Sequence, residues 1–447
     1  MTYSALWFSQ LQFFGSLGFM AVFFAISLGL SWVLFFLRLR AMGERHLLWL
    51  PVYRFWVRVF ALAFLVSFAS SMPVLIQLGS LWSGLLPKIQ AISSPVLAVT
   101  LLGALVFKAA FLGLMLFGQR QLTEWLHATI VLLVALGNSL VALGLLVLVS
   151  WLHTPTGAEW VEGSYVVQNW TEVVFNPSFI WYVLLFIAAS FLMVALLMVS
   201  VSVLRSMRRP LGEAERRTFK VAIYLGSAAW LLLLVAFIGN GNMVAHYQPI
   251  KAAAAMAYWD STATPSWLWL AWPSSTEMLN HFSFGFPNSG RPWLGTEADG
   301  TWFGLDQVAG MSPPVGLVFW SLRVAMLAGL LALVVFLQGW RLGVLKHYDP
   351  SALTLTHRRV LAVCAGSLGP LLLLSGMAYQ LFGNLPFAVA QTVTLTEVYS
   401  QPTLAQSVFS FFAYGLSYVL VVVGFIALVR QVARYGVVSV ARRRGRA

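Results

Sequence analysis

Charge is scarce in this chain of 447 residues. Only 9% of the residues are Asp, Glu, Lys or Arg, whereas 60% are hydrophobic, and the mean hydropathy is +0.83. A soluble domain carries about 25% charged residues. Most of the chain must therefore face lipid or other helices, which excludes an ordinary soluble enzyme.

Cysteine is nearly absent, because Cys364 is the only one and lies inside an apolar stretch. A single cysteine excludes an intrachain disulfide framework and a site ligated by several thiolates. The sequence also lacks a phosphate-binding glycine loop and a zinc-type cluster. We therefore expect neither a metal site nor a catalytic residue set within this chain.

What the chain has instead is a series of long apolar runs. A helix needs about 20 apolar residues to cross the hydrocarbon core of a bilayer. The pattern predicts an all-α polytopic membrane protein with about nine transmembrane helices, forming a single transmembrane domain over residues 1–447. The predicted spans are residues 11–37, 52–78, 94–117, 125–150, 179–203, 219–239, 315–339, 359–382 and 407–429.

The basic residues predict the orientation of these spans, because Lys and Arg collect on cytoplasmic loops. Of the 27 basic residues, 22 follow spans one, three, five, seven and nine, which puts the N-terminus outside and the C-terminus in the cytoplasm. This arrangement explains the net charge of +13 without nucleic acid as a partner. The C-terminal cluster Arg442, Arg443, Arg444 and Arg446 has a second interpretation as a contact with anionic lipid.

One connection is long: residues 240–314, between spans six and seven on the predicted outer side. It is rich in Trp, Pro, Gly and Asn. A connection of this length in a compact protein is usually ordered and functional, or docks on a partner.

Acidic residues are missing from all nine predicted spans: nine of the 14 carboxylates fall on the outer side and five on the inner side. Because intramembrane proton relays usually depend on such groups, the chain alone is a poor candidate for a proton pump.

Six of the seven histidines are predicted to lie in loops, and only His127 lies at membrane depth. His127 would need a thioether such as Met20, Met193 or Met326 to hold a haem with two axial ligands. A packed, hydrogen-bonded helix histidine is the favoured alternative.

Two cations, Lys108 and Arg323, are predicted to lie within spans three and seven. An intramembrane cation is costly unless it faces a partner group or a cavity, or extends to the interface. Because no span carries an acid, each must contact backbone carbonyls, outer-loop acids, a ligand or a second subunit. A site at a channel or subunit interface and a structural contact between helices both remain open.

Short motifs along the chain resemble those of one family. Residues 134–140 read VALGNSL, 151–157 read WLHTPTG, 248–253 read QPIKAA and 383–387 read GNLPF, and Asn176-Pro177 precedes span five. In order and spacing these motifs are similar to VALGSNL, WMQxPxG, QPxKxAA and GRQPW in subunit I of the cytochrome bd quinol oxidases. The resemblance covers nearly the whole chain and implies that residues 240–314 correspond to that family's quinol-binding Q-loop.

The chain departs from the family at the positions that the resemblance assigns to haem and quinol. The first-helix haem histidine aligns with Met20, the two glutamates of helix three with Thr100 and Lys108, and the low-spin haem histidine with Leu185. In the family, a methionine two residues after an arginine of helix seven is the partner of this low-spin haem histidine, and it aligns with Ala325. The arginine itself is present as Arg323, and Met326 is adjacent to the expected position. The remaining departures are Met256 for the Q-loop glutamate, Asn384 for the arginine of GRQPW, and Gly376-Met377 for the GW pair of span eight.

These departures lead to one main hypothesis and two alternatives. The main one is a haem-free or haem-poor subunit of a bd-type quinol:oxygen oxidoreductase complex in a bacterial or archaeal cytoplasmic membrane. It would pair with a haem-bearing subunit I that carries haems b and d and meets the quinol, with lipid and small single-helix subunits as further partners. The first alternative is an electron-transfer subunit that binds haem through His127. The second is a quinone-binding membrane protein that reuses Gln248 and Lys251.

Overall fold

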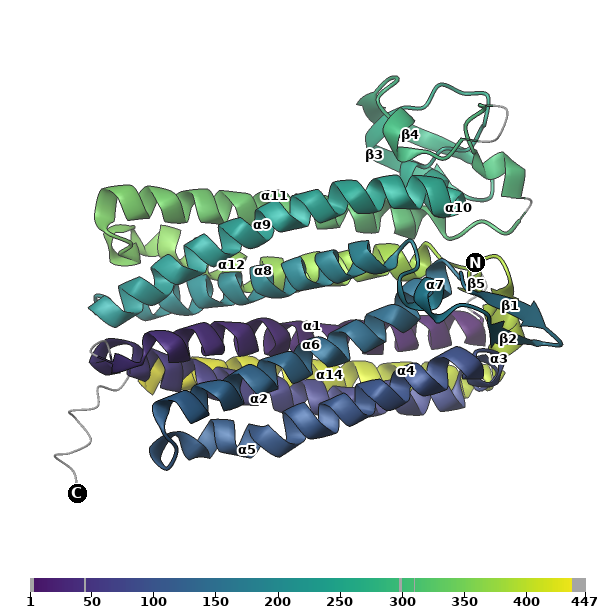
Figure 1. Cartoon of the computed structure of the whole chain (residues 1–447). Helices are drawn as coiled ribbons and strands as arrows, with labels where there is room; N and C mark the ends of the chain where they lie inside the picture. Colours follow the sequence, from purple (N-terminus) through teal and green to yellow (C-terminus); the bar gives the residue numbers. More distant parts are fainter. Residues whose placement is uncertain (1–3, 44–45, 297–299, 309, 436–447) are drawn as a thin grey trace.

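The computed structural model describes residues 4–43, 46–296, 300–308 and 310–435. Within these ranges nine helices are long and apolar enough to cross a membrane, as the sequence predicts. They run side by side in one bundle (Figure 1). The spanning helices are α1 (Ala5–Arg40), α2 (His46–Ser80), α4 with α5 (Gln90–Gly103 and Ala110–Phe117), α6 (Glu124–His153), α8 (Phe179–Ser206), α9 (Glu213–Tyr247), α11 (Val315–Lys346), α12 (Leu355–Phe382) and α14 (Leu404–Tyr435).

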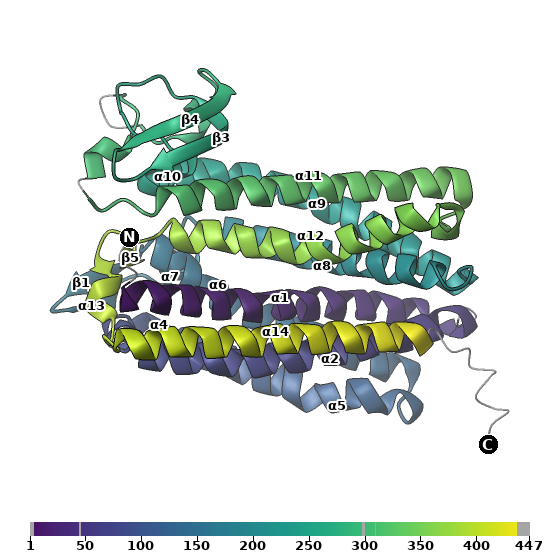
Figure 2. The same cartoon turned by 180° about the vertical axis from the view of Figure 1, so that it is seen from behind.

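The shorter elements gather at one end of the bundle, which also holds the N-terminus (Figures 1 and 2). We call it the outer end, since the basic residues predict that it faces outwards, and the opposite end the inner end. Three two-stranded antiparallel hairpins lie there, β1–β2, β3–β4 and β5–β6. The elements are α3 (Leu85–Lys88), β1 (Ala158–Val161), β2 (Ser164–Val167), α7 (Trp170–Val174), α10 (Pro249–Met256), β3 (Trp267–Ser274), β4 (Leu279–Phe286), β5 (Phe387–Val389), β6 (Val393–Thr394) and α13 (Leu395–Val398).

Several helices begin at a side chain that accepts a hydrogen bond from the first turn. Ser4, Thr123 and Thr354 play this part for α1, α6 and α12. Such caps satisfy backbone N–H groups that have no partner within the helix. The helices extend past the predicted spans into the flanking loops; α9, for example, continues to Tyr247. The connection predicted over 240–314 therefore starts eight residues later than expected.

The third span is interrupted by a π-helical segment, Ala104–Ala109, between α4 and α5. Segments of this kind often occur at functional sites or where a helix must accommodate an extra residue. Lys108 lies in this segment, so its side chain leaves the helix where the backbone is irregular.

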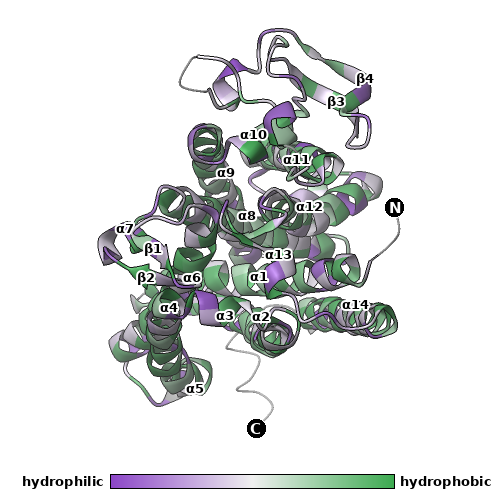
Figure 3. Ribbon diagram, turned by 90° about the vertical axis from the view of Figure 1, so that its right-hand side faces the viewer, coloured by the Kyte–Doolittle hydropathy of each residue, from purple (hydrophilic) through white to green (hydrophobic). Residues whose placement is uncertain are grey.

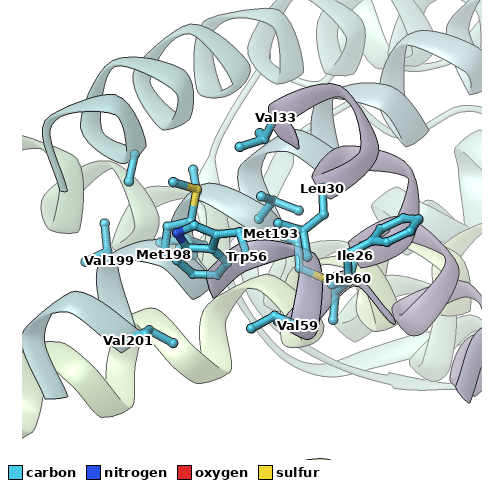
Figure 4. Packing of buried hydrophobic residues seen from close by; sticks show 14 of the residues in the cluster. Ile26, Leu30, Val33, Trp56, Val59, Phe60, Met193, Met198, Val199 and Val201 are labelled. Carbon is cyan, nitrogen blue, oxygen red and sulfur yellow. The ribbon is translucent and has the colours of Figure 1, made fainter. Parts of the chain in front are cut away.

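The core of the inner half is formed largely by α1, α2 and α8. Figure 4 shows Ile26, Leu30 and Val33 of α1 facing aromatic and aliphatic side chains of the other two helices. Gly29 lets α1 and α8 approach closely, because a Cβ there would come within 2.8 Å of the Ser190 carbonyl oxygen. Small residues allow helix backbones to approach each other in membranes, where the hydrophobic effect does not drive helix association.

Viewed from the outer end, α9 and α11 lie at one side of the bundle, and α4 and α5 lie at the opposite side (Figure 3). The outer segment between Tyr247 and Val315 lies over α9 and α11, and contains α10 and the β3–β4 hairpin. Arg45 and the basic cluster Arg442–Arg446, which helped to predict the orientation, lie outside the described residues.

Candidate functional site

A buried amine, Lys251 on α10, is the centre of a polar network at the outer end. The helix begins at Pro249, whose fixed φ suits the first helical position, and ends at Met256, after which Ala257 has a left-handed φ of 48°. Lys251 is 2% exposed. Its Nζ donates to Oε1 of Gln248 at 2.5 Å and to Oε1 of Gln380 at 3.0 Å. The structure thus brings together the two residues that the sequence singled out in this loop.

One branch of the network crosses to α8 and α6. Tyr182 donates its hydroxyl proton to Oε1 of Gln380 at 2.8 Å. Nδ1 of His153 lies 2.7 Å from the same hydroxyl. Because the single hydroxyl proton is already used, Nδ1 of His153 must carry the proton and donate it to the Tyr182 oxygen. His153 is therefore a buried hydrogen-bond donor within the network.

A second branch connects Gln248 to the start of α8. Nε2 of Gln248 donates to Oγ of Ser178 at 3.0 Å, and the hydroxyl of Thr154 donates to the same oxygen at 2.9 Å. Asn176 in turn donates from Nδ2 to Oγ of Ser150 at 2.9 Å. Buried polar groups need such partners, and a fully satisfied network fixes the relative positions of the elements that supply it.

The network holds a cation without a counter-ion. The described carboxylates form no ion pair with Lys251, and its Nζ lies 5.9 Å from the ring centroid of Tyr379. Removal from water lowers the pKa of the Lys251 amine from its ordinary 10.5 to about 7. The amine can therefore exchange a proton near neutral pH, but no described carboxylate pairs with it to act as a second proton acceptor.

The pKa of Lys251 gives a stability prediction. Below pH 7 the amine is charged in both the folded and the unfolded chain, so the full cost of burying the charge is present. Between pH 7 and 10.5 the folded amine is neutral while the unfolded amine still binds its proton, so stability rises with pH. The apparent melting temperature, followed by tryptophan fluorescence, should rise over this range in the native chain. The rise should be clearly smaller in Lys251→Met, and an equal rise in both would contradict the prediction.

Arg323 fastens α11 to the outer segment. Its guanidinium donates to the carbonyl oxygen of Ala255 on α10, and from Nε and Nη2 to the carbonyl oxygen of Leu268 on β3, at 3.1 and 2.7 Å. It also lies over the rings of Trp267 and Phe319, at 4.9 and 3.9 Å from their centroids. Among the alternatives left open by the sequence, these contacts are those of a structural cation held by backbone carbonyls.

Lys108 is held differently, by aromatic faces. Its Nζ lies 5.3 Å from the ring centroid of Phe24 on α1 and 5.0 Å from that of Phe64 on α2. No described carboxylate forms an ion pair with it. Cation–π contacts compensate part of the desolvation cost of an amine. The amine therefore points between helices of its own chain.

His127 lies near the inner end, fully buried. Its Nε2 donates to the carbonyl oxygen of Met115 at 3.1 Å, and Nδ1 has no hydrogen-bond partner among the described residues. The start of α6 is level with Arg38, which donates to the Glu124 carbonyl at 3.3 Å. Met20 lies 18 residues before Arg38 on α1, about 27 Å along the axis.

The other two candidate thioethers are also far from His127 in depth. Met193 lies 13 residues before the inner end of α8, and Met326 lies 20 residues before the inner end of α11. These separations correspond to about 20 and 30 Å of helix. The structure does not bring any of the three predicted methionines to His127.

Comparison with known proteins identifies the family. The profile of "Cytochrome bd terminal oxidase subunit I" matches residues 8–437. The chain belongs to the cytochrome bd terminal oxidase subunit I family. It is 24% identical to the cytochrome bd ubiquinol oxidase subunit 1 of Bacillus subtilis over 435 residues, which is 92% of this chain and 90% of that protein.

Two further comparisons agree with this assignment. The chain is 26% identical to the cytochrome bd-II ubiquinol oxidase subunit 1 of Escherichia coli over 269 residues, 60% of this chain and 52% of that protein. The structure of bd oxidase from Geobacillus thermodenitrificans has the same fold, with a TM-score of 0.83, 18% identity and coverage of 97% of this chain and 99% of that one. The nine apolar helices and the family place the chain in the cytoplasmic (inner) membrane as a multi-pass component of a quinol oxidase.

At two of the expected haem positions, Thr100 and Lys108, the residues of this bd-family chain do not fit a haem. The hydroxyl of Thr100 donates a hydrogen bond to the carbonyl oxygen of Val96 at 2.7 Å. A Cβ at Gly144 of α6 would lie 1.9 Å from that hydroxyl oxygen, so α4 and α6 are in direct contact there. At Gly137 a Cβ would come within 3.0 Å of Cγ of Lys108. Direct helix contact leaves no gap for a porphyrin at these two positions.

Several members of the network were not predicted from the sequence, among them His153, Tyr182 and Gln380. His153 was assigned to a loop, but it ends α6 and is 4% exposed, so that prediction was wrong. His46, His246 and His357 likewise lie in terminal helix turns and not in loops. Tyr182 and Gln380 belong to none of the motifs described above. The position of His153 inside the WLHTPTG motif, one residue before the buried Thr154, was the feature of the sequence that could have indicated a buried histidine.

Proposed function

We propose that this bd-family chain is a haem-free or haem-poor subunit that pairs with a haem-bearing subunit I in a quinol:oxygen oxidoreductase complex. Its part in the complex is structural, or that of a partner lining an oxygen, proton or quinol path. The haems b and d, and the oxidation chemistry, belong to the partner.

The observation that carries this proposal is the position of Lys108. An amine with a positive charge stands where the family resemblance expects a haem-binding glutamate, and it lies against the rings of Phe24 and Phe64. A cation at that position opposes the positive charge of a ferric haem. The direct contact of Lys108 with α6 at Gly137 removes the space as well.

The polar network supports a structural part for the outer end. Gln248 and Lys251 are the quinol-loop residues that persist, and their side chains are satisfied by Ser178 and Gln380 of the same chain. Side chains that already bond to each other and to their own chain have less capacity to bind a quinone. This favours a retained folding contact over the quinone-binding alternative.

Haem content tests the proposal directly. The purified chain, expressed alone, should contain far less than one haem per chain by the pyridine haemochrome assay, because the axial ligands of the family are missing. His127→Leu should leave that content unchanged. Stoichiometric haem in the isolated chain would overturn the proposal, and its loss in His127→Leu would establish the relocated-ligand alternative.

Purification from the native membrane tests the pairing. An affinity-tagged chain should co-purify with a haem-bearing subunit I and show its visible absorption spectrum. Recovery of the chain without a second subunit would contradict the pairing and favour the quinone-binding alternative.

A further inference from the structure

The β3–β4 hairpin carries a large apolar surface that none of the described residues covers. Trp272 is 64% exposed, and Phe282, Phe284 and Phe286 are 58–59% exposed. We call the exposed apolar side chains of this hairpin the aromatic rim: Trp269, Leu270, Trp272, Met278, Leu279, Phe282, Phe284 and Phe286. A two-stranded hairpin is marginally stable by itself, and soluble proteins rarely expose apolar patches of this size.

The hairpin is attached to the rest of the chain on one side only. Trp267 and Ala271 are buried beneath it. Asn280 donates to the carbonyl of Ala257 at 3.0 Å and accepts from the indole of Trp259 at 3.0 Å. Together with the bond from Arg323 to the carbonyl of Leu268, these contacts hold the hairpin in place and leave the aromatic rim outside.

The hairpin lies beside the helix bundle and not above its centre. Figure 3 shows β3 and β4 outside the ring of helices, beyond α9 and α11. In Figures 1 and 2 the hairpin runs alongside the outer turns of these two helices. Arg323, which bonds to β3, is eight residues into α11, about 12 Å from the helix start. The hairpin therefore lies beside a part of α11 that belongs to its predicted membrane span.

The α9 helix, which lies next to the hairpin, has an exposed apolar face. On α9 the exposed side chains Leu231, Val235 and Ile238 lead towards the outer end, with exposed fractions of 60%, 59% and 47%. The aromatic rim is a second exposed apolar surface, on strands that lie beyond α9 and α11 (Figure 3). Over residues 267–286 the only charged or titratable side chains are Glu277 and His281, which lie 3.5 Å apart.

We propose that the β3–β4 hairpin is a membrane anchor whose aromatic rim inserts into the boundary between headgroups and acyl chains of the outer leaflet. Trp and Phe side chains favour this boundary, where apolar area is removed from water while backbone and indole groups keep polar partners. The rim's lack of charge and its depth beside lipid-facing helices favour lipid over a soluble protein as its partner. The anchor fixes the height of α10, which holds Lys251, relative to the bilayer.

Spin-label accessibility in lipid nanodiscs tests the anchor. In a Cys364→Ser background, nitroxides at Trp272→Cys and Phe284→Cys report on the rim, and Glu159→Cys on the exposed strand β1 is the matched control. Nanodiscs of phosphatidylcholine and phosphatidylglycerol hold the full chain with any subunits that co-purify. Collision with a water-soluble nickel chelate should be about tenfold lower at the two rim positions than at the control, while collision with oxygen stays high.

Either of two results would overturn the anchor. Nickel collision equal to that of Glu159→Cys would place the rim in water. Low collision with both reagents would mean that a protein surface covers the rim. A second experiment uses a conservative variant that is expected to fold, Trp269→Phe with Trp272→Phe. Bromine-labelled phosphatidylcholine should quench the tryptophan fluorescence of this variant less than that of the native chain. Equal quenching would also count against insertion.

Discussion

Replacing Glu215 with glutamine is expected to destabilise the chain strongly. Glu215 lies at the start of α9 with its side chain 6% exposed. Its Oε1 accepts from the buried Arg205 and, at 2.8 Å, from Arg209, and its Oε2 accepts from the backbone N–H of Gly212 at 3.0 Å. One carboxylate therefore joins the end of α8 to the start of α9.

The glutamine variant keeps the shape but removes the charge. Arg205 is 8% exposed and would remain as a buried cation without a counter-ion. Removing one partner of a buried ion pair costs about 3–5 kcal/mol. The apparent melting temperature in detergent, followed by tryptophan fluorescence, should fall by many degrees.

Glu213 is the matched control, two residues away on the same helix. Its side chain is 68% exposed and pairs with Arg217 in an i,i+4 arrangement. Exposed pairs of this kind contribute about 0.3–0.5 kcal/mol, so Glu213→Gln should leave the melting temperature nearly unchanged. Equal shifts in the two variants would show that the Glu215 cluster is not a stabilising junction.

Arg323→Met is expected to release the outer segment while the helices stay folded. The change leaves the carbonyl oxygens of Ala255 and Leu268 without their donor. Each buried carbonyl that loses its partner costs about 1–3 kcal/mol. If the two together cost about 3 kcal/mol, the population of the opened segment rises about 100-fold.

Limited proteolysis measures this opening, because cleavage in the outer segment follows the opened population. The cleavage rate between α9 and α11 should rise strongly in Arg323→Met and only partly in Arg323→Lys, which keeps one donor. Arg341→Met is the control, since Arg341 lies on the same helix and is exposed. An unchanged cleavage rate in Arg323→Met would show that the segment is held by other contacts.

The helices could be predicted from the sequence because each apolar run exceeds the thickness of the hydrocarbon core. Their ends could not. Hydropathy detects only the apolar part, whereas α2 starts at His46 and α9 continues to Tyr247, through polar residues. The caps at Thr123 and Thr354 were present in the sequence, but they become recognisable only when the helix that follows is known.

The candidate site was predicted only in part, for a similar reason. Gln248 and Lys251 are three residues apart, so one turn of helix places them on the same side. Their partners come from other helices: Gln380 lies 129 residues from Lys251, and Tyr182 lies 198 residues from Gln380. Spacing along the chain contains no information about such pairs. Arg323 could be recognised as costly, but its acceptors are backbone atoms, which leave no mark in a sequence.

The attachment made by Arg323 has a consequence for how the outer segment can change. Both of its acceptors are main-chain carbonyls, so new side chains at positions 255 and 268 leave the bonds in place. The other contacts of the segment do depend on side chains, because Asn280 bonds to Ala257 and Trp259 and the ring of Trp267 lies against Arg323. Sequence changes in this segment should therefore be tolerated best at positions that are exposed and make none of these contacts.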